Sequence, residues 1–164
     1  MEKGKENRVD FTKLDHSISI SDLINSFQIP QKALDNYLLS VLMDYIPDSI
    51  YFKDLESRFI KVSKGMMKYA RVSSEEEILG KTDFDFFGHE HASEARKDEL
   101  EIIKTGKPII NKVEKENFSD GRVEWVSTTK IPLKDSEGNI IGTFGMSRNI
   151  SATSRKRRYR RARI

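Results

Sequence analysis

The sequence predicts an α+β fold built around an antiparallel β-sheet. Two short strand-like segments joined by a turn come first, several short helical segments follow, and three longer strand-like segments close the pattern. Strands grouped apart from helices favour antiparallel pairing, because hairpins need no crossover helix. The 164 residues, 37% of them hydrophobic, suffice for one core and tails.

Composition and periodicity divide the chain into four parts. We predict a flexible N-terminal segment, an amphipathic flanking helix, a folded domain and a basic tail, over residues 1–30, 31–47, 48–151 and 152–164. Pro47 ends the helix. The helix must bury its apolar stripe, either on its own sheet or on a second copy of the chain, and the two alternatives stay open. The stripe comprises Leu34, Leu38, Val41 and Tyr45.

Strand and turn signals order the elements of the domain. Residues 49–53 and 58–62 have the β-branched and aromatic composition of a hairpin. Asp120-Gly121 is a strong hairpin turn and, with a turn at 136–138, separates the three later strands. Those strands are expected at 109–118, 122–133 and 139–150, and helices at 64–70, from 73, at 82–85 and over 90–104.

Several stretches of the domain form a familiar pattern in order and spacing. They are Ile50–Asp54 with Arg58–Ile60, Gly80–Phe87, Thr105–Pro108, Trp125–Asp135, Gly138–Gly142 and Ser147–Ser151. Together they resemble the PAS family. The resemblance implies a PAS-like fold, a five-stranded antiparallel sheet with short helices on one face and the flanking helix on the other. The closing segment departs from the family, since Asn149 and Ser151 replace its Asp and Thr.

Alternation along the strands separates the two faces of the sheet. In the family's geometry Trp125 and Phe144 lie on the outer face. The opposite face and the helices would supply a ligand-binding set comprising Tyr51, Lys53, Phe84, Phe87, Val126, Thr128, Lys130, Thr143 and Ser147. Its two lysines would suit a polar, anionic ligand, but we expect both to reach solvent at the strand ends. Helix side chains such as Phe84, Phe87, Leu100 and Ile103 could also fill the space.

Cofactor chemistry is restricted by the absence of cysteine. Cysteine-dependent flavin photochemistry of the LOV type is excluded, as are disulfides and cysteine-based zinc sites. Asp83 occupies the position of the LOV cysteine. A haem would need an axial ligand such as His91, but we expect His89 and His91 to be surface residues at a helix start. The identity of any cofactor stays open.

Catalytic motifs are also missing from the sequence, so we expect a protein that is not an enzyme. The acidic residues do not have calcium-loop spacing. We expect Asp83, Asp85, Asp98 and Glu99 to cap helices and to pair with Arg96 or Lys97.

The tail from Arg155 to Arg163 carries seven Lys or Arg, more than the whole net charge of +3. It could bind nucleic acid or anionic lipid, although we favour the start of a linker helix. No apolar run reaches the roughly 20 residues of a membrane span, and we expect a cytoplasmic protein.

We predict a regulatory sensor, as in two-component signalling, that binds a small molecule or a partner protein. It would relay the state through its flanking helices to an effector, as a homodimer. A ligand-free homodimerisation module and a DNA-associated regulator are the alternatives.

Overall fold

The computed structural model describes residues 30–151. The predicted flexible segment, except for Pro30, and the basic tail lie outside the described residues. The chain divides into two compact units within helix α2 (Gln31–Tyr45), after Leu39, and the unit from Ser40 onward holds the whole sheet. Among the described residues, no helix combines the length and apolar character that crossing a bilayer requires.

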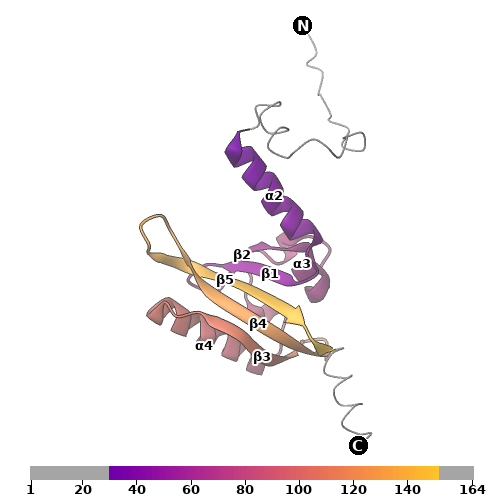
Figure 1. Cartoon of the computed structure of the whole chain (residues 1–164). Helices are drawn as coiled ribbons and strands as arrows, with labels where there is room; N and C mark the ends of the chain where they lie inside the picture. Colours follow the sequence, from indigo (N-terminus) through magenta and orange to yellow (C-terminus); the bar gives the residue numbers. More distant parts are fainter. Residues whose placement is uncertain (1–29, 152–164) are drawn as a thin grey trace, which may run out of the picture. The chain divides into compact units, whose positions relative to one another are not determined.

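Five antiparallel strands form one sheet (Figure 1). The first hairpin comprises β1 (Ser49–Lys53) and β2 (Phe59–Val62), and the meander comprises β3 (Ile109–Asn117), β4 (Val123–Lys134) and β5 (Ile140–Asn149). The strand order is β2-β1-β5-β4-β3, so the pairing of β1 with β5 joins the two groups. The predicted α+β fold with a five-stranded antiparallel sheet is confirmed, and each strand ends within one residue of its predicted bounds.

Side-chain caps define the short helices between β2 and β3. The Ser63 hydroxyl accepts a hydrogen bond from the Met66 amide and opens α3 (Lys64–Ala70). The 3₁₀ turn η2 (Glu75–Glu77) follows, and Thr82 with Asp85 forms the predicted capping box of the turn η3 (Asp83–Asp85). The long helix α4 (His89–Thr105) ends at Gly106, whose φ of 69° suits a residue without a side chain.

The helix α4 packs against β3, β4 and β5 on one face of the sheet (Figure 1). We call the sheet face toward α4, α3 and η3 the inner face, and the opposite one the outer face. The hydrophobic core lies on the inner face, beside α3 and η3. Its buried members are Tyr51, Phe59, Val62, Met66, Ile78, Phe87 and Phe118.

Two glycines permit close approaches that position the later elements. A Cβ added to Gly145 of β5 would overlap the ring of Tyr51, which lies over this glycine from β1. A Cβ added to Gly65 of α3 would overlap the Asp48 carbonyl oxygen. The α3 backbone is therefore in close contact with the segment that leads from α2 into β1.

An ion pair links β1 and β5, which are the first and last strands in the sequence and neighbours in the sheet. The buried Asp48 carboxylate, just before β1, accepts hydrogen bonds from Arg148 near the end of β5, at 2.6 Å from Nη2 and 3.0 Å from Nε. The two residues are 100 positions apart in the sequence. A two-pronged guanidinium contact of this kind fixes orientation as well as distance.

Candidate functional site

Lys53, the last residue of β1, is a buried cation at the centre of the inner face. Its side chain is 1% exposed, and its ammonium group contacts the Asp83 carboxylate and lies 2.7 Å from Glu99 Oε1. Burial alone would lower the pKa of Lys53, but the two carboxylates raise it, so the side chain is charged. The prediction that Lys53 reaches solvent is wrong, because α4 and η3 cover the strand end with carboxylates.

Glu99 extends this network into α4 and the β1–β2 turn. Its second oxygen accepts a hydrogen bond from the Ser57 hydroxyl, and Arg96 donates to the same hydroxyl at 2.6 Å. The prediction that Asp83 and Glu99 pair with Arg96 or Lys97 is wrong, since both carboxylates take the buried Lys53 as their cation. Arg96 reaches Glu99 only through Ser57.

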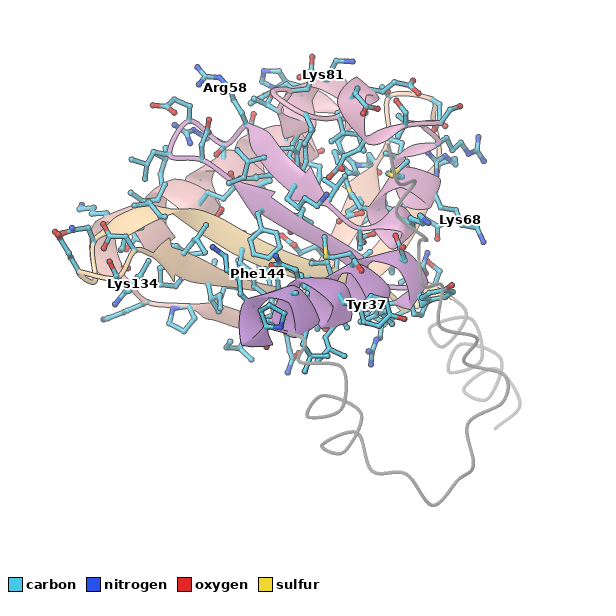
Figure 2. All side chains as sticks on the ribbon, turned by 90° about the horizontal axis from the view of Figure 1, so that it is seen from above. Tyr37, Arg58, Lys68, Lys81, Lys134 and Phe144 are labelled. Carbon is cyan, nitrogen blue, oxygen red and sulfur yellow. The ribbon has the colours of Figure 1, made fainter. Side chains whose placement is uncertain are left out.

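Lys130 of β4 is the second buried cation, and its predicted exposure is also wrong. It is 3% exposed and donates to the Ala95 carbonyl at 3.4 Å. Its Nζ lies 3.8 Å from Asp98 and 3.9 Å from Glu99. Asp98 pairs more closely with Lys112, at 2.6 Å, rather than with the predicted partners on its own helix. Other basic side chains project outward, as Figure 2 shows for Arg58, Lys68, Lys81 and Lys134.

Glu116 of β3 is a buried carboxyl group of a different kind. It is 4% exposed and accepts a hydrogen bond of 2.7 Å from the Tyr69 hydroxyl. Burial raises the pKa of Glu116 to about 7, and the charges of Glu114 and Asp83 add to this effect, while Tyr69 and Lys130 oppose it. Within residues 30–151, no lysine or arginine lies within 4 Å of Glu116, and the His91 Nε2 atom lies 3.7 Å from its Oε1 atom.

His91 faces this carboxyl group from the first turn of α4. The prediction of a surface histidine is correct for His89, which is exposed, and wrong for His91, which is 6% exposed. Burial lowers the pKa of His91, so its ring is neutral. Its Nδ1 atom has no hydrogen-bond partner among the described groups.

These groups surround one small cavity on the inner face. Its volume is about 20 Å³, roughly enough for a single water molecule. A porphyrin does not fit a space of this size. The lining residues are Ser49, Tyr51, Lys53, Phe59, Met66, Tyr69, Asp83, Phe87, His91, Ala95, Glu114, Glu116, Lys130 and Ser147.

The nine residues predicted for ligand binding divide into three groups. The cavity is lined by five of them, Tyr51, Lys53, Phe87, Lys130 and Ser147. Val126, Thr128 and Thr143 are buried on the same face beside it, with the Thr128 and Ser147 hydroxyls 3.0 Å apart. The placement of Phe84 is wrong, because its side chain is 48% exposed and packs its ring near His89.

The flanking helix adds one residue that the predicted stripe omitted. Met43 is buried, whereas Tyr45 is 81% exposed and Val41 is half-buried. Leu34 and Leu38 belong to the first unit of the chain. Coverage of the outer face by this helix, and the dimer it would form, stay predictions.

Comparison with known proteins identifies the family. A family model described as PAS fold matches residues 43–155. The chain belongs to the PAS-fold family. The match begins within α2 and includes every strand of the sheet.

A curated relative and several solved structures resemble this PAS domain. The methanogenesis regulatory histidine kinase FilI of Methanothrix harundinacea is 24% identical over 156 residues, which are 92% of this chain and 17% of that relative. The chain thus spans about a sixth of the relative's length. The Vibrio cholerae VqmA dimer has a TM-score of 0.63 at 24% identity, covering 71% of this chain and 52% of VqmA. The PAS domain of Bordetella pertussis BvgS has a TM-score of 0.54 at 25% identity, covering 82% and 98%.

Sequence reasoning missed the acidic half of the site in this PAS domain. A signal was present in α4, where Glu99 continues the 3- and 4-residue spacing of the buried Ala92, Ala95 and Ile102. The corresponding pattern in β3 is visible only in the structure, where Glu114 and Glu116 are buried while Val113 and Lys115 are exposed. A charged residue in a buried register indicates a partner in the interior.

Proposed function

We propose that this PAS domain is a sensory module that binds a small molecule at the inner-face cavity and relays the bound state to its flanking segments. The observation that carries the proposal is the buried polar cavity, to which strands β1, β3, β4 and β5 and helices α3 and α4 contribute. The relatives support a regulatory role, since FilI is a regulatory histidine kinase and VqmA has been solved bound to DPO.

The free-energy cost of burying the charged side chains supports a binding role for the cavity. Buried ion pairs cost desolvation free energy that apolar residues of similar volume would not incur. Groups with strongly shifted pKa values also gather at functional sites, and Glu116 is such a group. A sheet face that served only as a core would need neither feature.

The helix α3 offers a route from the cavity to the flanking segment. Tyr69 of α3 lines the cavity and holds Glu116, while Gly65 of the same helix touches the Asp48 backbone. Lys64 of α3 also lies 3.2 Å from Asp44 near the end of α2. A ligand that displaces Tyr69 therefore shifts a helix that contacts the α2–β1 junction. The ligand acts by favouring one of two arrangements of this helix.

We also propose that the domain acts without catalysis. None of the serine hydroxyls lining the cavity is hydrogen-bonded to a histidine in the described part of the chain, so the activated nucleophile of hydrolases is missing there. The Asp83 and Glu99 carboxylates are occupied by Lys53.

The direct test is to identify what the purified protein binds. Mass spectrometry of denatured protein, and thermal-shift screening with a library of metabolites, should yield a compound that raises the midpoint of unfolding. Hydrogen exchange should then slow in α3 and at residues 46–48 when that compound is added. If no compound binds, or if exchange changes only at sites remote from α3, the sensory proposal is wrong.

A ligand-free homodimerisation module is the second candidate, and the outer face favours it. Four apolar side chains on this face are more than a third exposed, Val113, Val123, Trp125 and Ile131. Contiguous exposed apolar surface is typical of interaction sites. Analytical ultracentrifugation decides this candidate, because a monomer at high protein concentration contradicts it.

A DNA-associated role is a third proposal, which depends on the basic tail outside the described residues. VqmA has been solved with a ligand and DNA. Salt-sensitive DNA binding that is lost on deletion of residues 154–164 would support this role, and DNA binding that survives the deletion would contradict it.

A further inference from the structure

The charges that line the cavity are unevenly matched. Both cations have carboxylate partners, since Lys53 contacts Asp83 and Glu99, and Lys130 lies near Asp98 and Glu99. Glu116 has no lysine or arginine within 4 Å in the described part of the chain. When Glu116 is ionised, the cavity therefore presents a surplus of negative charge, located at this one carboxyl group on β3.

The hydrogen-bonding capacity of the same corner is also unmet. The His91 Nε2 atom lies 3.7 Å from Glu116 Oε1, too far for a hydrogen bond. The Nδ1 atom of the same ring has no hydrogen-bond partner among the described groups. A 94% buried ring with an unpartnered nitrogen thus lies beside a carboxyl group that has no lysine or arginine partner. The ionised carboxylate favours a positive charge that carries hydrogen-bond donors.

We propose that the ligand of this domain carries a small ammonium group, seated between Glu116 and His91 in the inner-face cavity. This inference rests on the proposed sensory function and names the ligand's chemical class. An ammonium nitrogen supplies both hydrogen-bond donors and a positive charge to the carboxylate. The existing space of about 20 Å³ suits a group of that size.

The carbon skeleton attached to the ammonium group needs additional room. Met66 and Tyr69 of α3 form one wall of the cavity, and methionine side chains adjust readily to new neighbours. An alkylammonium ligand larger than the cavity therefore displaces this wall. The displaced element is the helix that contacts the α2–β1 junction, so the ligand's size links binding to the relay.

An anionic ligand fits this cavity poorly. The two lysines that would attract an anion are engaged with carboxylates. A carboxylate placed near Glu116 would also face Asp83, Glu114 and the neutral His91. The groups facing Glu116 from the other elements are Tyr69 on α3, Asp83 on η3, His91 on α4 and Lys130 on β4.

The test uses three one-carbon probes that differ in charge, methylammonium, methanol and formate. Each is titrated into the full chain, and the carboxyl carbon of Glu116 and the ring nitrogens of His91 are followed by NMR. Methylammonium should shift both residues in a saturable manner, whereas methanol and formate should bind at least tenfold more weakly. Its affinity should increase with pH and level off above about 7, because Glu116 must be ionised to bind the cation.

Matched variants distinguish binding at Glu116 from a nonspecific effect of the protein's net charge. Glu116→Gln keeps the shape and the contact with Tyr69 but removes the charge, and it should weaken methylammonium binding about tenfold or more. Glu94→Gln, on the exposed side of α4, removes the same charge from the same chain and should leave binding unchanged. Equal weakening by both variants would show a nonspecific charge effect and overturn the proposal.

The remaining outcomes distinguish this inference from the proposed function. If formate or methanol binds more tightly than methylammonium, the proposal of an ammonium ligand is wrong. It is also wrong if the NMR chemical shifts respond to pH but to none of the three probes. If the library screen also finds a neutral or anionic ligand, the sensory function stands while this inference fails. If neither the probes nor the library bind, both fail together.

Discussion

The two faces of the sheet contrast, because the inner face buries charged side chains beside the hydrophobic core and the outer face leaves apolar side chains exposed. The buried inner face holds Lys53, Lys130, Glu114 and Glu116, whereas the outer face exposes the apolar Trp125 and its neighbours. Phe144 lies on the outer face in Figure 2. Apolar side chains normally gain most from burial, and charges lose most. The inner face therefore buries charges that must find partners in the interior, and the outer face leaves apolar surface exposed.

The largest expected effect comes from breaking the charge balance of the inner face. Lys53→Met leaves Asp83 and Glu99 buried without their cation and should lower the free energy of unfolding by about 3–5 kcal/mol. Urea denaturation measures the change. Lys61→Met is the control, because the Lys61–Glu75 pair is solvent-exposed and contributes at most about 1 kcal/mol. Similar losses for the two variants would mean that the buried network is not a coupled unit.

Glu116 should make the stability of the inner face depend on pH. Its pKa is about 7 in the folded state against 4.5 for an ordinary glutamate, so the folded state binds the proton more tightly. The resulting stability is complete below about pH 4.5 and is lost as the pH rises through 7, amounting to about 3 kcal/mol. Glu116→Gln should flatten this part of the profile of unfolding free energy against pH. An unchanged profile in the variant would assign the dependence to another group.

The contact between β1 and β5 provides a steric test of the same face. Gly145→Ala places a methyl group against the Tyr51 ring and should cost about 1–3 kcal/mol of unfolding free energy, the usual range for overpacking. The double variant with Tyr51→Ala removes the obstructing ring, so the added methyl should then cost less. Additive effects in this thermal-denaturation cycle would contradict the contact.

The smallest effect compares one substitution on both faces. Val126→Thr puts a hydroxyl group at a 1% exposed position and should destabilise by about 1–2 kcal/mol. Val113→Thr makes the same change at a 59% exposed position and should alter stability by no more than about 0.5 kcal/mol. Chemical denaturation of the pair measures the difference between the faces. An equal cost at both positions would show that Val113 is covered in solution, as in a dimer.

Strand parity made much of the fold predictable from the sequence. Hairpin turns and the strand-ending residues locate the elements, and a period of two assigns Val126 and Trp125 to opposite faces. The two-residue alternation assigns each side chain to a face of the sheet, but it does not reveal whether a helix covers the end of a strand. For this reason Lys53 and Lys130 were expected to reach solvent. Their partners on α4 and η3 depend on tertiary register.

The misplacement of Phe84 has a related cause. The turn η3 has three residues, too few to show a helical period, and it directs Asp83 inward while Phe84 points outward. His91 was misplaced because the first turn of α4 lies under β3, a contact between elements far apart in the sequence. The elements were thus predictable from local patterns, while the charge network required knowledge of how the elements pack.

The Asp48–Arg148 pair means that the polypeptide enters and leaves the sheet at adjacent points. The register of β1 on β5 sets Ser49 opposite Ser147, so the segments on either side of the domain begin as neighbours. A domain whose two ends are adjacent can be inserted between two helices of a longer protein while the joined ends of those helices stay close together. The Asp48–Arg148 contact joins these two points directly, so the ends of the domain are held together by one ion pair as well as by the pairing of β1 with β5.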